Sequence, residues 1–382
     1  MPGGRLVSSG RRPAATLWRD AAASQGIAVA SQNYYQILQV PVDATQDHIQ
    51  SAYRELAKQL RSDDSSVTAP NEERVKLLDE AFETLRDQDR RAAYDLEIQR
   101  AVMGSAAPAS RLALVRAYWP RTLLQVGVFI VFAIVAMNVL ALVALFIPNL
   151  FLASAISVFL GSLLATALAM RIFFHLPAVA VGLHWNPPAA RNLCTGMLMG
   201  IVAGAIATLL PVATGIVRWE PTAEPFSVSA LIVFLVLILF SAIGEEILFR
   251  GFPLQRLQET FGPAPAVLVT SLLFGWAHAG NLSVTWVAIL NTFLWGVVFG
   301  CAWLKTRDLW LPIGLHVGWN WTLPLLGVQL SGFTLEVTGY RLVGGGTLWD
   351  GGAYGPEAGL ITTVLVPAML FVIWRAPIRR SA

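Results

Sequence analysis

The distribution of apolar residues divides the chain into a polar first third and a long hydrophobic remainder. From Thr122 onward, apolar spans recur, and most approach the length of about 20 residues that a membrane-crossing helix needs. The eight spans lie near residues 122–147, 150–170, 191–217, 228–249, 264–279, 284–304, 309–330 and 358–374. The pattern predicts a membrane domain over residues 122–376, a polytopic bundle of about eight transmembrane helices.

Residues 33–100 show a different pattern, that of amphipathic helices. Apolar positions recur with helical spacing in IQSAYRELAKQL and again in NEERVKLLDEAFETLRD. Asp43 or Thr45 can cap the first of these helices, and Asn71 the second. We therefore predict a small soluble helical domain here, so that the fold class is all-α throughout.

The segments on either side of this domain carry no such periodicity. Residues 1–32 are rich in Ala, Ser, Gly and Arg, and their first acidic residue is Asp20. This composition is typical of a disordered tail, and it also fits a transit peptide. Residues 101–121 are predicted to be a linker.

Charge sharpens the division between the two parts. The chain is 55% hydrophobic and 13% charged. Of its 51 charged residues, 27 Lys+Arg and 24 Asp+Glu, 30 fall within the first 118 positions. The formal net charge of +3 does not indicate nucleic-acid binding, because the basic residues occur singly and form no stripe. Two cysteines are too few for a disulfide framework or a cysteine-based zinc site.

The basic residues also predict an orientation in the membrane. With the soluble domain in the cytoplasm, ten basic residues fall on inside segments and two on outside segments, which satisfies the positive-inside rule. We expect a multi-pass protein with both termini cytoplasmic, in a bacterial inner membrane or, alternatively, an organelle membrane. A Gly-rich segment, 331–357, would form a long outside loop.

A few polar residues interrupt the apolar spans. Ionisable side chains are costly in a bilayer, so they indicate a functional site, with helix packing as the alternative explanation. Glu246 and Arg250 are four residues apart, in the order that favours an ion pair on a helix. Glu245 points about 100° away from Glu246 and is free to face something else. Three further polar residues of the hydrophobic block are His278, His316 and Asn320.

These residue types together suit water attack on a carbonyl group. A poorly solvated carboxylate such as Glu245 is a competent general base, and His278 can help to hold the water. His316 and Asn320 share a helix face and can donate to a developing oxyanion. Zinc bound by Glu245, His278 and His316 is the competing account, and the sequence leaves both accounts open.

Three motifs make this reading more specific. In order along the chain they are EExxxR, FxxxH and HxxxN, on three separate predicted spans. Through them residues 228–322 resemble the CPBP family of intramembrane proteases, which includes CAAX prenyl endopeptidases and bacteriocin-immunity relatives, and the protease core is placed at about 228–330. The resemblance implies that Glu245 activates the water with help from His278, that His316 and Asn320 form the oxyanion hole, and that Glu246 and Arg250 orient and brace. The motif residues are Glu245, Glu246, Arg250, Phe274, His278, His316 and Asn320.

The soluble domain resembles a J-domain. The resemblance rests on the segments YYQIL at 34–38, AYRELA at 52–57, AFETL at 81–85 and RRAAYD at 90–95. Where that family carries His-Pro-Asp, which engages an Hsp70 partner, this chain has Arg61-Ser62-Asp63. We therefore expect a J-like module that docks a cytoplasmic protein partner and does not stimulate an Hsp70.

These observations predict an intramembrane endopeptidase, of glutamic or metallo type, that cleaves a membrane-associated protein or peptide. The alternative is a non-catalytic membrane scaffold or immunity-type protein that uses the protease fold for binding. A transporter ranks lower, since no matched pair of broken half-helices stands out between the two halves of the chain.

Overall fold

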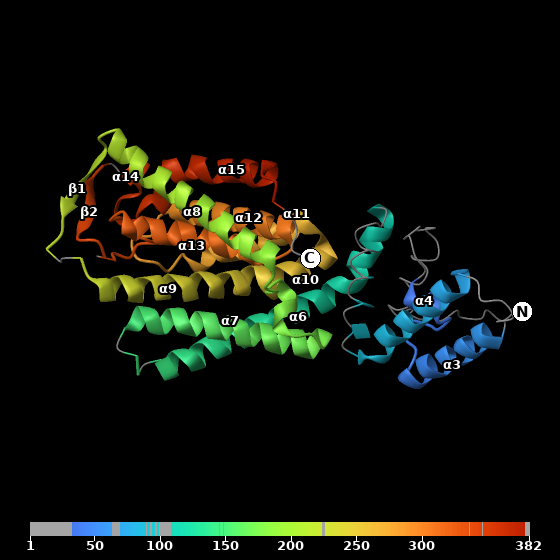
Figure 1. Ribbon diagram of the computed structural model, residues 1–382. Coiled ribbons are helices and arrows are strands. Elements are labelled where there is room, and N and C mark those ends of the chain that lie inside the picture. Colours follow the sequence, from blue (N-terminus) through green and yellow to red (C-terminus); the bar gives the residue numbers. More distant parts are fainter. Residues whose placement is uncertain are drawn as a thin grey trace, which may run out of the picture. The chain divides into compact units, whose positions relative to one another are not determined.

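The computed structural model describes residues 33–378, apart from 63–68, 89, 92–93, 96–97, 99–107, 145, 148, 224–225, 336 and 346. The predicted tail, 1–32, lies outside the described residues. The chain divides into two compact units, one of residues 1–120 with 174–176, and one of residues 121–173 and 177–382 (Figure 1).

The first unit contains the predicted small helical domain. Its helices are α2 (Tyr34–Ile37), α3 (Gln46–Ser62) and α4 (Ala69–Arg86). Thr45 caps α3, since its hydroxyl accepts a hydrogen bond from the backbone N–H of His48 at 3.3 Å. The rings of Tyr53 and Phe82 stack at 4.0 Å between α3 and α4. Buried apolar residues fill the centre of this helical hairpin, among them Leu38, Ile49, Leu78 and Leu85.

The second unit is a bundle of apolar helices. Its elements up to the first motif are α6 (Pro108–Ala144, which begins in the first unit), α7 (Leu150–Phe174), η1 (Ala178–Val181), α8 (Pro187–Ala213), β1 (Val217–Pro221) and α9 (Val228–Glu246). The later elements are η2 (Ile247–Gly251), α10 (Phe252–Phe261), α11 (Pro263–Ala277), α12 (Trp286–Thr306), α13 (Trp310–Leu325), β2 (Tyr340–Gly344), α14 (Thr347–Asp350), η3 (Gly352–Tyr354), η4 (Pro356–Ala358) and α15 (Leu360–Arg375).

Within the described residues, five helices are long and apolar enough to cross a membrane: 115–144, 150–174, 187–213, 228–261 and 286–306. The chain is an integral membrane protein by this measure. Two shorter apolar helices, 263–277 and 360–375, accompany them, and α13 has 16 residues. The number of eight membrane crossings stays a prediction.

Two predicted boundaries differ from the structure. Helix α6 begins at Pro108, so residues 108–121, predicted to be a linker, are helical. The fourth span does not end at residue 249, because α9 continues through the single π-helical turn η2 into α10 and stops at Phe261. Polar residues in 255–260 made this segment look like a connection, whereas they are buried against other helices.

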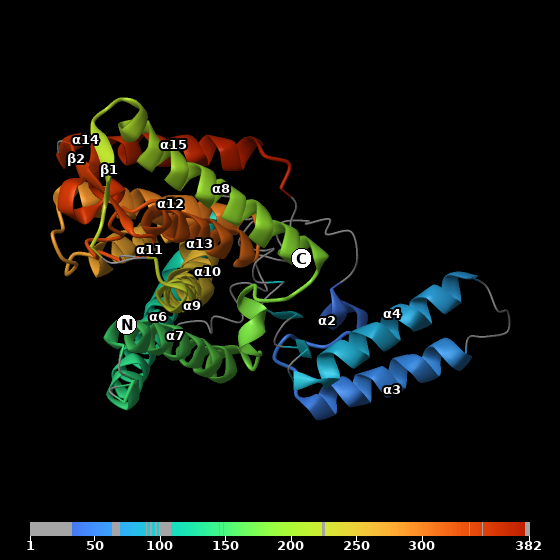
Figure 2. The ribbon, with the colours of Figure 1, turned by 60° about the vertical axis from the view of Figure 1, so that its left-hand side comes forward.

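Helix α9 lies between two groups of helices, as Figures 1 and 2 both show. On one side are α6 and α7, and on the other are α8, α12, α13 and α15. The first motif spans the end of α9 and η2, the second lies at the end of α11, which packs against α12, and the third lies on α13.

Glycines bring α8 and α13 into backbone contact. A Cβ atom added at Gly200 would lie 2.3 Å from a backbone oxygen of α13, and one added at Gly314 would lie 2.2 Å from a backbone oxygen of α8. Gly196 and Gly318 meet the opposite helix in the same way. Small residues four positions apart are typical of tightly packed membrane helices. This contact fixes the rotation of α13, which carries the third motif.

The predicted long loop 331–357 is folded rather than extended. Strand β2 within it pairs antiparallel with β1, with Trp219 opposite Leu342. The short helices α14, η3 and η4 follow. The segment therefore forms a structured cover at the end of the bundle where α8 and α13 finish.

Candidate active site

The end of α9 and its π turn place the first motif. Ser241 lies one turn before Glu245, and its hydroxyl donates to Glu245 Oε1 at 2.9 Å. Glu246 and Arg250 form the expected ion pair, with 3.1 Å between Oε1 and the nearest guanidinium nitrogen, and both side chains are fully buried. The two adjacent acids therefore face different surroundings.

A reversal at Gly262 brings the second motif to the first. Gly262 has a φ of 90°, a conformation that favours glycine, and it joins α10 to α11. Glu245 lies 17 residues before Gly262 and His278 lies 16 residues after it. At about 1.5 Å per residue, both side chains lie about 25 Å from the turn and so at matching depth.

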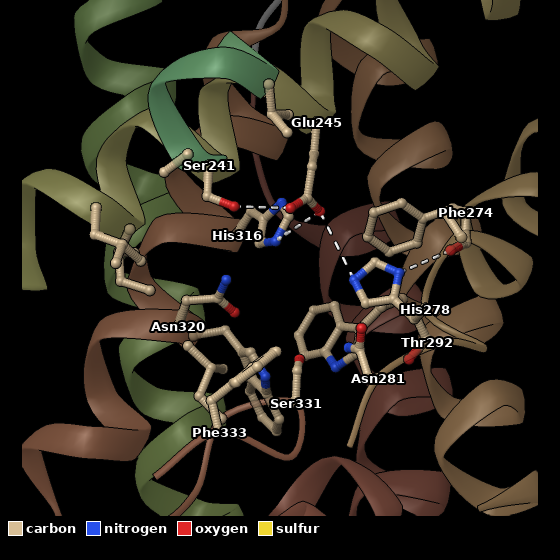
Figure 3. Close-up of a pocket in the computed structure, with 18 of the residues that line it drawn as sticks. Ser241, Glu245, Phe274, His278, Asn281, Thr292, His316, Asn320, Ser331 and Phe333 are labelled. Atoms are coloured by element: carbon tan, nitrogen blue, oxygen red, sulfur yellow. Dashed lines mark hydrogen bonds and ion pairs between the residues drawn. The ribbon is translucent and has the colours of Figure 1, made fainter. Parts of the chain in front are cut away.

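The third motif faces the same space from α13. His316 lies two residues from both Gly314 and Gly318, so it points about 200° away from the face that packs on α8. Asn320 follows one turn later on the side of His316. Figure 3 shows Glu245, His278, His316 and Asn320 around one cavity.

The two histidines converge on one oxygen of Glu245. Oε2 of Glu245 lies 3.9 Å from His278 Nε2 and 3.8 Å from His316 Nε2. These distances exceed a direct hydrogen bond and are those at which a bridging water is expected. Oε2 is buried and has no hydrogen-bond partner within the described part of the chain.

Hydrogen bonds to Nδ1 set the proton positions on both rings. His278 Nδ1 lies 2.9 Å from the carbonyl oxygen of Phe274, which can only accept, so Nδ1 carries the hydrogen. His316 Nδ1 lies 2.9 Å from Glu246 Oε1, which accepts in the same way when ionised. With Nδ1 so placed, Nε2 of each ring presents a lone pair to the cavity when the ring is neutral and an N–H group when the ring is protonated.

Arg250 is buried in an aromatic cage. Its guanidinium carbon lies 4.3 Å from the ring centroid of Phe274 and 5.1 Å from that of Phe299. It also donates to the carbonyl oxygen of Gly296 at 3.3 Å. Cation–π contacts and the ion pair with Glu246 together compensate for the loss of water around this charge. Phe274 thus holds His278 with its carbonyl group and Arg250 with its ring.

The cavity has a volume of about 420 Å³ and a mostly apolar wall. Its polar lining includes Glu245, His278, His316 and Asn320, and α6 and α7 contribute Met137, Phe151, Ser154, Ala155 and Val158. The side-chain amide of Asn320 has no hydrogen-bond partner among the described residues and points into the cavity (Figure 3). It is available to a bound molecule.

Glu245, His278 and His316 are the residues that the sequence offers as zinc ligands. Two imidazole nitrogens and a carboxylate oxygen are donor types that zinc accepts. However, among the described residues no three His, Cys, Asp or Glu side chains are grouped so that they could hold a metal ion. As they are placed, Glu245, His278 and His316 do not form a metal site.

Some residues of the site were missed from the sequence. Ser241 could have been found, because it precedes Glu245 by one helical turn. Ser331 and Glu357 also line the cavity, from the segment predicted to be a loop. Nothing in their local sequence distinguishes them from ordinary loop residues.

Comparison with known families identifies two domains. Residues 227–322 match the family model described as Type II CAAX prenyl endopeptidase Rce1-like, and this range contains the three motifs. Residues 33–95 match the DnaJ domain. Both likenesses inferred from motifs are confirmed.

Two curated relatives match this chain over about 65 residues. Chaperone protein DnaJ of Caldicellulosiruptor saccharolyticus is 45% identical over 64 residues, which are 17% of this chain and 16% of that protein. The curved DNA-binding protein of Coxiella burnetii is 49% identical over 65 residues, 17% of this chain and 20% of that protein. The chain thus spans a fifth or less of the length of these relatives. No solved structure matches it significantly.

Proposed function

We propose that this chain, which carries an Rce1-like endopeptidase domain and a DnaJ domain, is an intramembrane endopeptidase that cleaves a membrane-associated protein or peptide with water activated by Glu245. The convergence of Glu245 Oε2 with the Nε2 atoms of His278 and His316, at 3.9 and 3.8 Å, carries the proposal. The match of residues 227–322 to the endopeptidase family supports it.

The reaction uses the groups around the cavity in order. Water, held between Glu245 Oε2 and the Nε2 lone pair of His278, attacks the carbonyl carbon while Oε2 takes its proton. The carbonyl electron pair moves onto oxygen, where Asn320 Nδ2–H and the protonated ring of His316 donate to it. As the C–N bond breaks, the carboxylic acid of Glu245 returns the proton to the leaving nitrogen. Water, peptide and proton balance without any other reactant.

The proposal also covers the orientation of the chain in its membrane and the partner of the J-like domain. The positive-inside count supports cytoplasmic termini, in a bacterial inner membrane or, alternatively, an organelle membrane. The J-like domain would then dock a cytoplasmic protein partner. That partner is not an Hsp70, because Arg61-Ser62-Asp63 replaces His-Pro-Asp; Asp63 lies outside the described residues.

Cleavage of a membrane-peptide library by the purified full chain tests the function. Wild type should cleave, E245Q should not, and E220Q, which changes a partly exposed acid of β1, should cleave as wild type does. Each protein is also run with a strong chelator, and loss of cleavage there would replace the glutamate mechanism by a zinc one. A folded wild type that cleaves nothing would favour the scaffold alternative.

A further inference from the structure

A second group of polar side chains faces the catalytic residues across the cavity. Figure 3 shows Asn281, Thr292 and Ser331 on the side away from Glu245. Tyr354 and Glu357 lie with them, and Asn281 Nδ2 donates to the Tyr354 hydroxyl at 3.4 Å. The reaction proposed above uses none of these residues, so their burial needs a separate explanation.

Glu357 is the centre of this group. Its Oε2 accepts from the backbone N–H of Ser331 at 2.5 Å and from the Ser331 hydroxyl at 2.8 Å. Its Oε1 accepts from Trp319 Nε1 at 3.3 Å. The side chain is buried, with 8% exposed, and no Lys, Arg or His among the described residues forms an ion pair with it. A buried carboxylate without a cation is costly, and three hydrogen bonds compensate for that cost.

The backbone of Glu357 is itself fixed. Asn291, fully buried on α12, donates from Nδ2 to the carbonyl oxygens of Glu357 and Gly359 at 2.8 and 3.1 Å. Burial raises the pKa of the Tyr354 phenol, and the negative charge of Glu357 raises it further, so the phenol stays a neutral neighbour. Hydrogen bonds from Asn291 on α12 therefore fix the backbone that carries the Glu357 carboxylate.

The segment that Glu357 holds forms a wall of the cavity. Residues 330–333 make a tight turn in which Leu330 and Phe333 exchange both backbone hydrogen bonds, at 3.0 and 2.8 Å. Phe333 lines the cavity and meets the ring of Phe151 on α7 edge-on at 5.2 Å. At its other oxygen, Glu357 holds Trp319, which directly precedes Asn320 on α13.

We propose that Glu357 is a positioning residue, which anchors the turn 330–333 to α12 and α13 and so fixes the cavity wall that a bound peptide would meet opposite Glu245. The role toward the peptide rests on the proposed function, whereas the anchoring of the turn does not. Loss of the anchor should loosen the turn and weaken substrate binding without touching the groups that activate water.

Amide hydrogen exchange in the purified full chain tests the anchor. In E357A, exchange in peptides that span residues 328–335 should speed up by about tenfold, as expected when hydrogen bonds to a charged group are lost. E357Q keeps one acceptor oxygen and should give a smaller increase. The control is E220Q, which changes a partly exposed acid of β1 that does not line the cavity and should leave this segment unchanged.

If exchange over residues 328–335 is unchanged in both Glu357 variants, Glu357 does not anchor the turn. If E357A does not fold, the measurement on E357Q alone decides this. On a peptide that wild type cleaves, E357Q should raise KM about tenfold with kcat within about twofold. A fall in kcat at constant KM would overturn the positioning role. Should wild type cleave nothing, the proposed function fails, while the exchange measurement still decides whether Glu357 anchors the turn.

Discussion

His316 Nδ1 lies 2.9 Å from Glu246 Oε1, so the second glutamate of the pair holds a histidine that comes 70 residues later in the chain. The same oxygen also accepts from Arg250 at 3.1 Å. Glu246 is thus shared between a buried cation and the ring that faces Glu245. The adjacent glutamates have separate tasks, one structural and one directed at the cavity.

This difference predicts unequal effects of the two substitutions on stability. E246Q should lower the free energy of unfolding by about 3–5 kcal/mol, because it leaves the buried Arg250 without its partner charge. E245Q should change it by less than about 1 kcal/mol, since Oε2 of Glu245 has no hydrogen-bond partner to lose. Thermal unfolding of both variants in the same detergent measures the two effects. Equal losses would contradict the division of tasks.

Asn320 should matter for the reaction and not for the fold. Its amide has no partner among the described residues, so N320A should unfold within about 0.5 kcal/mol of wild type. Its kcat should fall by about 10²–10³, the usual cost of removing one oxyanion donor. Kinetics on the library peptide check this, and a large loss of stability with normal kcat would rule the role out.

The glycine contact between α8 and α13 should not tolerate a methyl group. G200A or G314A would place a Cβ atom 2.3 or 2.2 Å from backbone oxygen, and neither backbone can move without displacing its helix. We expect a loss of about 3 kcal/mol, with activity lost in parallel as His316 and Asn320 shift. G127A on α6 is the matched control, because a Cβ atom there meets nothing within 4 Å. Similar unfolding of all three variants would argue against the contact.

The J-like domain should gain an activity from two substitutions. R61H together with S62P would create His-Pro-Asp at positions 61–63. The purified wild-type chain should not stimulate the ATPase of a bacterial Hsp70, whereas the double variant should. R61A with S62A serves as the control for the change in charge. Stimulation by wild type would show that the motif is dispensable here.

Asp95 predicts a pH dependence of the same domain. Burial raises the pKa of its carboxyl group, more than the hydrogen bond from Tyr35 and the charge of Arg91 lower it. A raised folded pKa favours the protonated form, so this contribution to stability is complete below the unfolded pKa of about 3.9 and is lost as the pH rises through the folded value. D95N should remove that dependence, which amide exchange of α2 at pH 4 and pH 7 would reveal. An unchanged dependence in D95N would assign it elsewhere.

The sequence predicted the membrane bundle, the small helical domain and the four cavity residues as a set. It did so because each motif combines a costly polar residue with helical spacing inside an apolar run. The depth of these residues in the membrane was harder to predict. A fourth span that ended at residue 249 placed Glu245 near one membrane surface and His278 far from that surface. The structure resolves this by continuing the helix to Phe261.

What the sequence could not show are contacts between polar residues far apart in the chain. Gln255 donates to the carbonyl oxygen of Val181 at 2.7 Å, and the hydroxyls of Thr122 and Thr260 meet at 2.7 Å across 138 positions. Because of such partners, the polar residues of segment 255–260 are buried in a helix, although their sequence is typical of a polar connection. The same reason hid Glu357, whose partners Trp319 and Ser331 belong to other elements.

The π turn at Ile247–Gly251 sets the angular phase between the two halves of the long helix. A wider turn holds one more residue than an α-helical turn would, and each residue accounts for about 100° of rotation. Deleting one residue there would keep the acids of α9 at the cavity but turn every side chain of α10 by that angle. Gln255 and Arg256 would then turn away from their present partners, the carbonyl oxygen of Val181 and the side chain of Gln125. The π turn thus lets one continuous helix direct the acids of α9 toward the cavity and the polar residues of α10 toward their partners on other helices.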